Sequence, residues 1–206
     1  MLVEDWGRLS YRPAWERQTA VVERVLAGGE DTLVLVEHEP VITLGANFHP
    51  ENLRLLEAEY GRRGIEVVRN DRGGDVTYHG PGQLVMYPIF DLKRHGQDLH
   101  KWMRDLEETM LATCRTYGLE ARRFPPHTGA WVGDRKIAAI GVKVRKWVSF
   151  HGIALNCLPQ DQAFATIVPC GIHGYGVTSL TQCLGRDVEA ADAKQAVCEA
   201  FRRVFG

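Results

Sequence analysis

The segment Arg72–Gln83, with the sequence RGGDVTYHGPGQ, constrains the fold of this chain more than any other feature. Four glycines and one proline fall within its 12 residues. Glycine permits positive φ and has no Cβ to keep a ligand away from backbone N–H groups, while proline stiffens the turn between the two halves. The segment alone is consistent with a ligand-binding loop and equally with a glycine-rich turn between Val76–Tyr78 and the apolar strand Leu84–Phe90.

Length and composition indicate one ordinary globular domain over residues 1–206. The chain is 45% hydrophobic and 25% charged, and its net charge of −1 produces no strong field that would attract nucleic acid. No stretch approaches the ~18 apolar residues needed to cross a bilayer, and the first residues lack the pattern of a signal peptide. We therefore expect a cytoplasmic protein that binds neither nucleic acid nor membrane.

The cysteines and histidines indicate neither a disulfide framework nor a metal site. The five cysteines, an odd number without a C-x-x-C pair, are Cys114, Cys157, Cys170, Cys183 and Cys198. Cys170 differs from the others because it stands between Pro169, which fixes φ, and Gly171, which frees it. The other four are expected to be small buried hydrophobes or to have no chemical role. The eight histidines show no H-x-x-x-H or H-E-x-x-H spacing.

Hydrophobic periodicity predicts helices that alternate irregularly with hairpins. The first expected element is a helix over Trp15–Leu26, which Gly28 and Gly29 stop. Strands are expected at 32–36, 41–44, 66–69 and 84–90, with a short helix over 53–60, a hairpin over 131–144 and a further strand over 147–155. This order predicts an α+β domain with a mixed, mainly antiparallel sheet flanked by helices, and not a doubly wound parallel sheet.

Two longer helices are predicted with their caps. Asp98 is placed to cap a helix that ends at Gly118 and carries one apolar face, formed by Leu99, Trp102, Leu106, Met110 and Cys114. Asp187 is placed to cap a final helix whose core-facing residues are expected to be Val188, Ala191, Val197, Cys198 and Phe201.

Three more segments accompany the glycine-rich one: Lys136–Gly141 (KIAAIG), His151–Asn156 (HGIALN) and Pro169–Gly171 (PCG). Together, and in this order, the four segments closely resemble the octanoyltransferases of lipoate biosynthesis over nearly the whole chain. The resemblance implies a single catalytic domain over residues 1–206, related in fold to the catalytic modules of biotin and lipoate protein ligases. It, and not the periodicity, supplies the specific topology.

The resemblance also implies the catalytic residues, Cys170 as the nucleophile and Lys136 as its partner. A free thiol with a reference pKa of about 8.5 is only a few per cent thiolate at neutral pH, although the thiolate is the attacking species. A lysine can stabilise the thiolate as a cation or accept its proton as a base, and both roles stay open for Lys136. The residues carried over as substrate-binding are Arg72, Gly73, Gly74, Asp75, Val76, Thr77, Tyr78, His79, Ala139, Ile140, Gly141, Gly152, Ile153 and Ala154.

The implied reaction has two halves and requires no cofactor. Cys170 first takes the octanoyl group from the thioester on acyl carrier protein. A lysine of a lipoyl domain then attacks the enzyme thioester and forms an amide, with Lys136 helping to remove a proton from the incoming ammonium. The implied acceptors are the lipoyl domains of 2-oxoacid dehydrogenase complexes and the glycine cleavage H protein.

Several supporting roles stay open in the sequence. Backbone N–H groups of Gly73, Gly74, Gly141 or Gly171 are candidate oxyanion donors. Ala138, Ala139, Ile140, Ile153 and Ala154 are candidates for the walls of an acyl channel, or simply fill the core. His79 and His151 either orient substrate, tune Cys170 or have structural roles. A basic set, either a docking patch for acyl carrier protein or a solvated face, consists of Arg122, Arg123, Lys143, Arg145 and Lys146.

Three other functions compete with octanoyl transfer. An ATP-dependent lipoate or biotin ligase uses a glycine-rich segment for an acyl-adenylate but needs no nucleophilic cysteine. A thiol hydrolase would pair Cys170 with His79 or His151, and a non-catalytic acyl-binding module would explain an apolar channel alone. The pairing of Cys170 with Lys136, and the absence of an appended second domain, favour the transferase.

Overall fold

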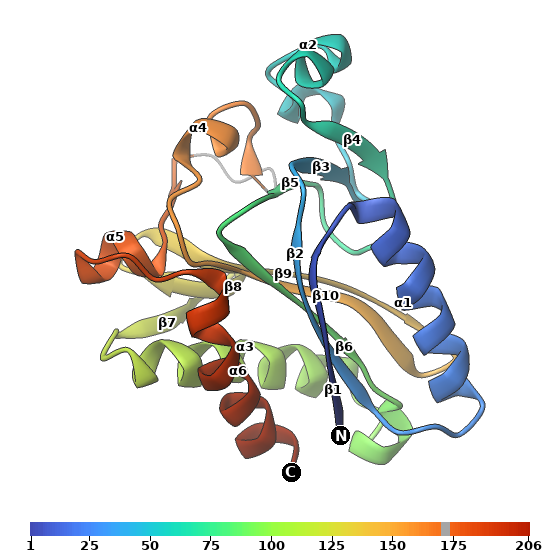
Figure 1. Cartoon of the computed structure of the whole chain (residues 1–206). Coiled ribbons are helices and arrows are strands. Elements are labelled where there is room, and N and C mark those ends of the chain that lie inside the picture. The colour runs from blue at the N-terminus through green and yellow to red at the C-terminus, as the bar shows by residue number, and fades with distance from the viewer. Residues whose placement is uncertain (170–173) are drawn as a thin grey trace.

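Two β-sheets form the framework of the chain in the computed structural model, which describes residues 1–169 and 174–206 (Figure 1). The larger sheet has the order β1-β2-β6-β10-β9-β8-β7, with β11 paired to β9. Its strands are β1 (Leu2–Leu9), β2 (Thr32–His38), β6 (Gln83–Ile89), β7 (Ala121–Phe124), β8 (His127–Val132), β9 (Arg135–Arg145), β10 (Val148–Asn156) and β11 (Gly176–Val177). The smaller sheet has the order β4-β3-β5 and consists of β3 (Val41–Leu44), β4 (Glu66–Arg69) and β5 (Val76–His79).

Among the strands described, β1–β2, β9–β11 and β3–β4 pair in parallel, and the other pairs are antiparallel. This arrangement confirms the predicted α+β fold with mixed, mainly antiparallel sheet. The expected strands and the hairpin of β8 and β9 are present at the predicted positions.

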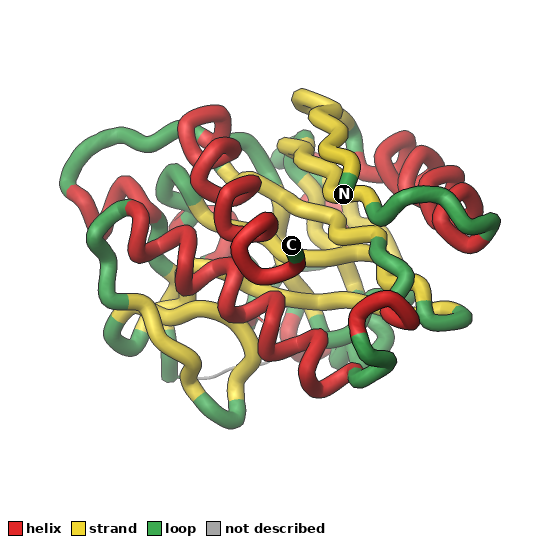
Figure 2. Tube along the Cα trace, turned by 90° about the horizontal axis from the view of Figure 1, so that it is seen from below, coloured by secondary structure: helices red, strands yellow, loops and turns green. Residues whose placement is uncertain are grey.

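Helices cover both faces of the larger sheet. One face packs against α1 (Tyr11–Leu26), and the other packs against α3 (Leu99–Thr116) and α6 (Ala190–Phe205), which Figure 2 shows in front of the strands. The shorter helices are α2 (Glu57–Arg62), α4 (Asp161–Phe164), α5 (Leu180–Leu184) and two 3₁₀ turns, η1 (Pro50–Asn52) and η2 (Leu92–His95). None of the helices in the described ranges is long and apolar enough to cross a membrane.

Helix α3 forms at the position that its cap and its apolar residues indicated in the sequence. The Asp98 carboxylate accepts hydrogen bonds from the backbone N–H groups of His100 and Lys101, at 2.8 and 3.0 Å. Trp102 and Leu106 are buried against the larger sheet. Leu99 does not join them and is 46% exposed, because residues 96–101 all lie at the surface, beyond the edge of the core.

The first element is a strand, and the expectation that a helix comes first is wrong. Strand β1 is a mostly exposed edge strand that pairs with β2 alone, so its residues carry no apolar face that periodicity could detect. The helix expected over 53–60 begins only at Glu57. Leu53 instead forms a bridge with Ile167, and the Arg54 N–H donates to the Thr166 carbonyl, so tertiary pairing replaces the first helical turn.

The cap of the last helix also differs from the prediction. Glu189, and not Asp187, is the N-cap of α6, and the side chain of Asp192 accepts a hydrogen bond from the Glu189 N–H at 2.9 Å. This start exposes Ala191 and turns Ala190 toward the core. Other core-facing residues of α6 are Ala193, Ala196, Val197, Ala200 and Phe201.

The substitution Leu106→Ala is expected to lower the free energy of unfolding by about 2–5 kcal/mol, because it opens a cavity under the larger sheet. Leu99→Ala, on the same helix, is a matched control and should change that free energy by less than about 0.5 kcal/mol. Urea unfolding followed by circular dichroism measures both. Equal losses would mean that the first turn of α3 belongs to the core.

Candidate functional site

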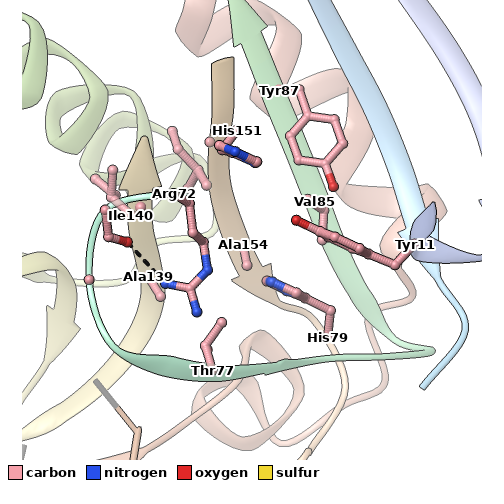
Figure 3. Close-up of a pocket in the computed structure, with 15 residues that line it drawn as sticks. Tyr11, Arg72, Thr77, His79, Val85, Tyr87, Ala139, Ile140, His151 and Ala154 are labelled. Carbon is pink, nitrogen blue, oxygen red and sulfur yellow. Dashed lines mark hydrogen bonds between the residues drawn. The ribbon is translucent and has the colours of Figure 1, made fainter. Parts of the chain in front are cut away.

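A pocket lies between the two sheets, on the face of the larger sheet that α1 covers (Figure 3). The space within this inter-sheet pocket is about 490 Å³, part of it open to solvent. Its lining residues are Tyr11, Arg72, Gly73, Gly74, Thr77, His79, Val85, Tyr87, Ala139, Ile140, Gly141, His151, Gly152, Ile153 and Ala154. All predicted substrate-binding residues except Asp75, Val76 and Tyr78 are among them.

The floor of the pocket follows from the strand register. Ala154 of β10 lies opposite Val85 of β6 and Ala139 of β9, so these three side chains share one face of the sheet. Their small size leaves room above the sheet. Ala138 falls on the opposite face and packs in the core with α3 and α6, which corrects its expected role as a channel wall. The side chain of Ile153 is also part of that core, although the residue borders the pocket.

Residues Arg72, Gly73 and Gly74 of the glycine-rich segment form the roof of the pocket. The buried side chain of Arg72 fixes its shape. Its Nε donates to the Thr43 hydroxyl at 3.0 Å, and Nη2 donates to the carbonyls of Thr43 and Asp75 at 2.7 and 2.6 Å. Its Nη1 donates to the Gly73 carbonyl at 2.9 Å, as Figure 3 shows. Charge-assisted bonds to carbonyl oxygens are strong, so Arg72 fixes the path of the glycine-rich segment and joins it to the smaller sheet.

The roof also packs closely against strand β9. The Gly73 N–H donates to the Val142 carbonyl at 3.0 Å, and a Cβ on Gly141 would lie 2.8 Å from the Gly73 oxygen. A side chain at position 141 would therefore push the roof away. Because the Gly73 N–H is already engaged, Gly73 is not available as an oxyanion donor in this conformation, which leaves Gly74 as the described candidate on this segment.

An ion pair joins the start of the roof to strands β9 and β10. The Asp71 carboxylate accepts hydrogen bonds from His151 Nε2 at 2.8 Å and from Lys143 Nζ at 2.7 Å. The bond from His151 holds the pKa of Asp71 well below its usual range, so Asp71 is ionised at neutral pH. Burial lowers the pKa of His151 although Asp71 opposes this shift, and the neutral ring is a donor at Nε2. His151 thus has a defined structural partner and also borders the pocket.

Three aromatic residues, Tyr11, His79 and Tyr87, form the wall opposite Ala139 and Ile140 (Figure 3). Burial lowers the pKa of His79 to about 3, so this ring is neutral. Burial raises the pKa of Tyr11 to about 12 and raises that of Tyr87 as well, so both hydroxyls keep their protons. No local motif in the sequence marks Tyr11, Val85 or Tyr87, because the start of α1 and strand β6 meet only in the fold.

The three predicted residues outside the pocket stabilise the smaller sheet. Side chains alternate along β5, so Thr77 and His79 face the pocket while Val76 and Tyr78 pack on the other side with a separate apolar cluster. The Asp75 carboxylate accepts bonds from the His49 N–H, the Val76 N–H and Asn52 Nδ2, at 3.1, 2.8 and 2.5 Å. Asp75, Val76 and Tyr78 thus lie outside the pocket that the other predicted residues line.

Lys136 lies at the junction of further cavities. Its side chain is buried, and its Nζ lies 5.0 Å from the ring centre of Trp131. It borders one cavity with Trp131 and Pro169, and a second cavity with Gly73, Gly74, Ile140 and Gly141. Since the inter-sheet pocket shares these last four residues, Lys136 lies beyond its Ile140 side. Lys136 is thus not the solvated surface charge that a lysine after a turn usually is.

Cys170 lies outside the described residues, as does Gly171. Pro169, which precedes it in the sequence, borders the same cavity as Lys136. The other four cysteines are free thiols, and burial raises the pKa of Cys114 and Cys157 to about 12 and also raises that of Cys198. Such thiols stay protonated at neutral pH. Within the described ranges, no group of three or more His, Cys, Asp or Glu side chains could hold a metal ion.

The predicted basic set does not form one patch. Arg122 lies opposite Trp131, which lies opposite Lys136, whereas Arg145 is nine residues further along β9, roughly 30 Å away. Three members pair with carboxylates: Arg123 with Glu107 and Glu108, Lys143 with Asp71, and Arg145 with Glu23. These charges are dispersed and partly neutralised, which contradicts the expectation of a single docking patch.

Solved structures share this fold at low sequence identity. A bipartite lipoate protein ligase from Thermoplasma acidophilum superposes with a TM-score of 0.71 at 17% identity, over 98% of this chain and 84% of that one. A lipoate-protein ligase A bound with ATP has a TM-score of 0.77 at 18% identity, over 98% and 84% of the two chains. Biotin protein ligase from Aquifex aeolicus has a TM-score of 0.57 at 11% identity, over 99% and 68%. These similarities confirm the predicted relation in fold.

Curated relatives are much more similar in sequence. An octanoyltransferase from Geobacter sp. strain M21 is 45% identical over 202 residues, 98% of this chain and 96% of that protein. An octanoyltransferase from Rubrobacter xylanophilus is 46% identical over 203 residues, 97% and 91% of the two chains. The profile of the family "Lipoyl protein ligase A/B catalytic domain" matches residues 10–202. The chain therefore belongs to the lipoyl protein ligase A/B catalytic domain family and, within it, to the octanoyltransferases.

Proposed function

We infer that this chain is an acyltransferase that moves an octanoyl group onto a lysine of a lipoyl domain, through a thioester on Cys170. The observation that carries the proposal is the placement of Lys136. Its buried side chain borders a cavity together with Pro169, the neighbour of Cys170 in the sequence, and it lies next to an apolar-floored pocket of suitable shape for an acyl chain. Residues 1–206 act in this proposal as one catalytic domain, since these cavities draw on residues from Tyr11 to Val177.

In the first half-reaction, the Cys170 thiolate attacks the carbonyl carbon of an octanoyl thioester. The tetrahedral oxyanion collapses, the new C–S bond remains, and the donor thiol leaves with a proton. Lys136 holds the thiolate as a cation or takes the thiol proton as a base. The pocket floor of Val85, Ala139 and Ala154 receives the alkyl chain, and each CH₂ that leaves water contributes ~0.8 kcal/mol to binding.

In the second half-reaction, the neutral amine of the acceptor lysine attacks the enzyme thioester, and the Cys170 sulfur leaves as the amide forms. An ammonium has no lone pair, so a base must first remove a proton, and the proposed base is Lys136, which shares a cavity with Pro169. The Gly74 N–H is proposed as a donor to the oxyanion of both tetrahedral intermediates.

The proposed donor is octanoyl-acyl carrier protein, and the proposed acceptors are the lipoyl domains of 2-oxoacid dehydrogenase complexes and the glycine cleavage H protein. Lipoylation enzymes share this fold, and one related structure was determined together with work on its E2 lipoyl domain, which supports lipoyl domains as acceptors. The four described cysteines are free thiols, as is usual in a reducing compartment, and this supports a cytoplasmic location.

The competing functions fit the site less well. A ligase shares the fold and could use Lys136 as a cation for the phosphate of an acyl-adenylate, but it assigns no role to the Cys170 thiol. A hydrolase would need a histidine as base near Cys170. Neither His79 nor His151 borders the cavity that Lys136 shares with Pro169, and both line the inter-sheet pocket instead.

Cys170→Ala is expected to abolish both formation of the octanoyl enzyme and transfer, because the described thiols at 114, 157 and 198 have raised pKa values. Intact-protein mass spectrometry after mixing with octanoyl-acyl carrier protein measures the adduct. Cys183→Ala is the matched control and should retain it. An adduct on another cysteine, with transfer intact in Cys170→Ala, would reassign the nucleophile.

Lys136→Met should keep the fold while slowing transfer at pH 7 by about 100-fold or more, since a general acid–base residue contributes 10²–10⁴-fold. Raising the pH should partly rescue the first half-reaction by restoring thiolate, so burst amplitude and rate are measured from pH 7 to 9.5. The control Lys93→Met, at an exposed lysine of η2, should behave as wild type. Wild-type turnover by Lys136→Met at pH 7 would exclude the proposed role.

The reaction should run with octanoyl-acyl carrier protein and an apo lipoyl domain in buffer free of nucleotide, because the thioester already carries the free energy for amide formation. Adding ATP and magnesium should change the rate less than twofold, and free octanoate with ATP should give no product. Gel-shift and mass measurements of the lipoyl domain follow the product. Efficient use of free octanoate and ATP by the Cys170→Ala variant would identify a ligase instead.

A further inference from the structure

The wall formed by Tyr11 and His79 contains hydrogen-bonding positions that no described residue fills. Gln83 Nε2 donates to the Tyr78 carbonyl and to Asn156 Oδ1, so its oxygen Oε1 accepts the bond from His79 Nδ1–H. Neutral His79 therefore has a bare lone pair at Nε2, for which the described part of the chain offers no donor.

Tyr11 has the complementary open position. Asn70 Oδ1 accepts a hydrogen bond from the Arg72 N–H, so Asn70 Nδ2 donates to the Tyr11 oxygen at 2.6 Å. The tyrosine thus acts as an acceptor, and its own O–H has no acceptor among the described residues. Its hydroxyl points into the pocket in Figure 3, and only 3% of the residue is exposed.

A third open position belongs to His151. Its Nε2–H donates to Asp71, and its Nδ1 is buried without a partner among the described residues. Tyr87, in contrast, is satisfied: His38 Nδ1–H donates to the Leu9 carbonyl, so His38 Nε2 accepts from the Tyr87 hydroxyl at 2.7 Å. The Tyr11 O–H is therefore an unused donor, and His79 Nε2 and His151 Nδ1 are unused acceptors, among the residues that line the pocket.

The unused groups of Tyr11 and His79 lie far from the reacting end. The pocket meets the cavity of Lys136 through Gly73, Gly74, Ile140 and Gly141, whereas neither Tyr11 nor His79 borders that cavity. Their rings stack at a centroid distance of 6.4 Å and an interplanar angle of 0°, so they form one continuous surface. An acyl chain whose carbonyl lies near Lys136 points its methyl end at this surface.

We propose that Tyr11 and His79 form a polar end wall, solvated by water, that limits the length of the acyl chain at about eight carbons. The assignment of an acyl chain to this pocket rests on the proposed function. In a wholly apolar channel, each added CH₂ strengthens binding about fourfold. A methyl group pushed against the Tyr11 hydroxyl and His79 Nε2 displaces water from groups that gain no new partner, and this loss outweighs the gain from the added CH₂.

The wild-type chain tests the wall directly through its affinity for free octanoate, decanoate and dodecanoate, measured by calorimetry. An end wall predicts that decanoate binds no more tightly than octanoate, whereas an apolar channel predicts about 16-fold tighter binding for its two extra CH₂ groups. Tighter binding of decanoate by the wild type would overturn the proposal.

Tyr11→Phe and His79→Leu remove one polar group each and should raise the ratio of decanoate to octanoate affinity by about tenfold. The ratio of kcat/KM for the two acyl thioesters should move in the same direction. Tyr60→Phe is the matched control, because it also removes a buried hydroxyl, which donates to the Thr166 carbonyl at 2.6 Å, but lies outside the pocket. Its ratio should remain that of the wild type.

Unchanged ratios in both pocket variants would show that the wall acts by shape alone and would overturn the proposal. If circular dichroism shows that Tyr11→Phe does not fold, the affinity ratio of His79→Leu and the wild-type affinities test the proposal. The affinity measurements need neither Cys170 nor turnover. If the wild type does not transfer octanoyl groups but still binds decanoate no more tightly than octanoate, the proposed function is rejected and the wall is kept. If it transfers octanoyl groups but binds decanoate more tightly, only the wall is rejected.

Discussion

The site depends on one buried charge, the guanidinium of Arg72. A buried cation is costly unless its donors are satisfied, and Arg72 meets this requirement with the Thr43 hydroxyl and three backbone carbonyls. These bonds fold the glycine-rich segment into a roof and join it to the smaller sheet. The same positive charge adds to burial in keeping His79 and His151 neutral. Arg72 thus fixes the shape of the pocket and also contributes to its electrostatics.

The cavities divide the proposed chemistry into two environments. The inter-sheet pocket has a floor of small apolar side chains and suits an alkyl chain, whereas Lys136 borders two further cavities, one of which it shares with Pro169. Lys136 lies where the two meet, with its Nζ near the Trp131 ring. A ping-pong reaction needs this arrangement, because the acyl group must stay bound while one carrier leaves and another arrives.

The fold itself does not decide between transferase and ligase. Lipoate and biotin protein ligases have the same architecture at 10–20% identity, and a common fold carries different chemistries. The feature that favours a transferase is local, namely the cysteine between Pro169 and Gly171, which a ligase does not need. The proposed polar wall of Tyr11 and His79 concerns which acyl chain enters rather than which reaction occurs.

The sequence by itself determined the elements whose signals are local: the capped helix α3, the hairpin of β8 and β9, and the glycine-rich segment. It also determined the family, because four motifs in a fixed order identify a family more specifically than any one of them does. Only the tertiary structure decided that Leu53 and Arg54 pair with Ile167 and Thr166 instead of forming a helix, and that Asp75 supports a loop. It alone brought Tyr11 within stacking distance of His79. Local propensity acts over a few residues, whereas a wall formed by residues 68 positions apart exists only after the strands between them have paired.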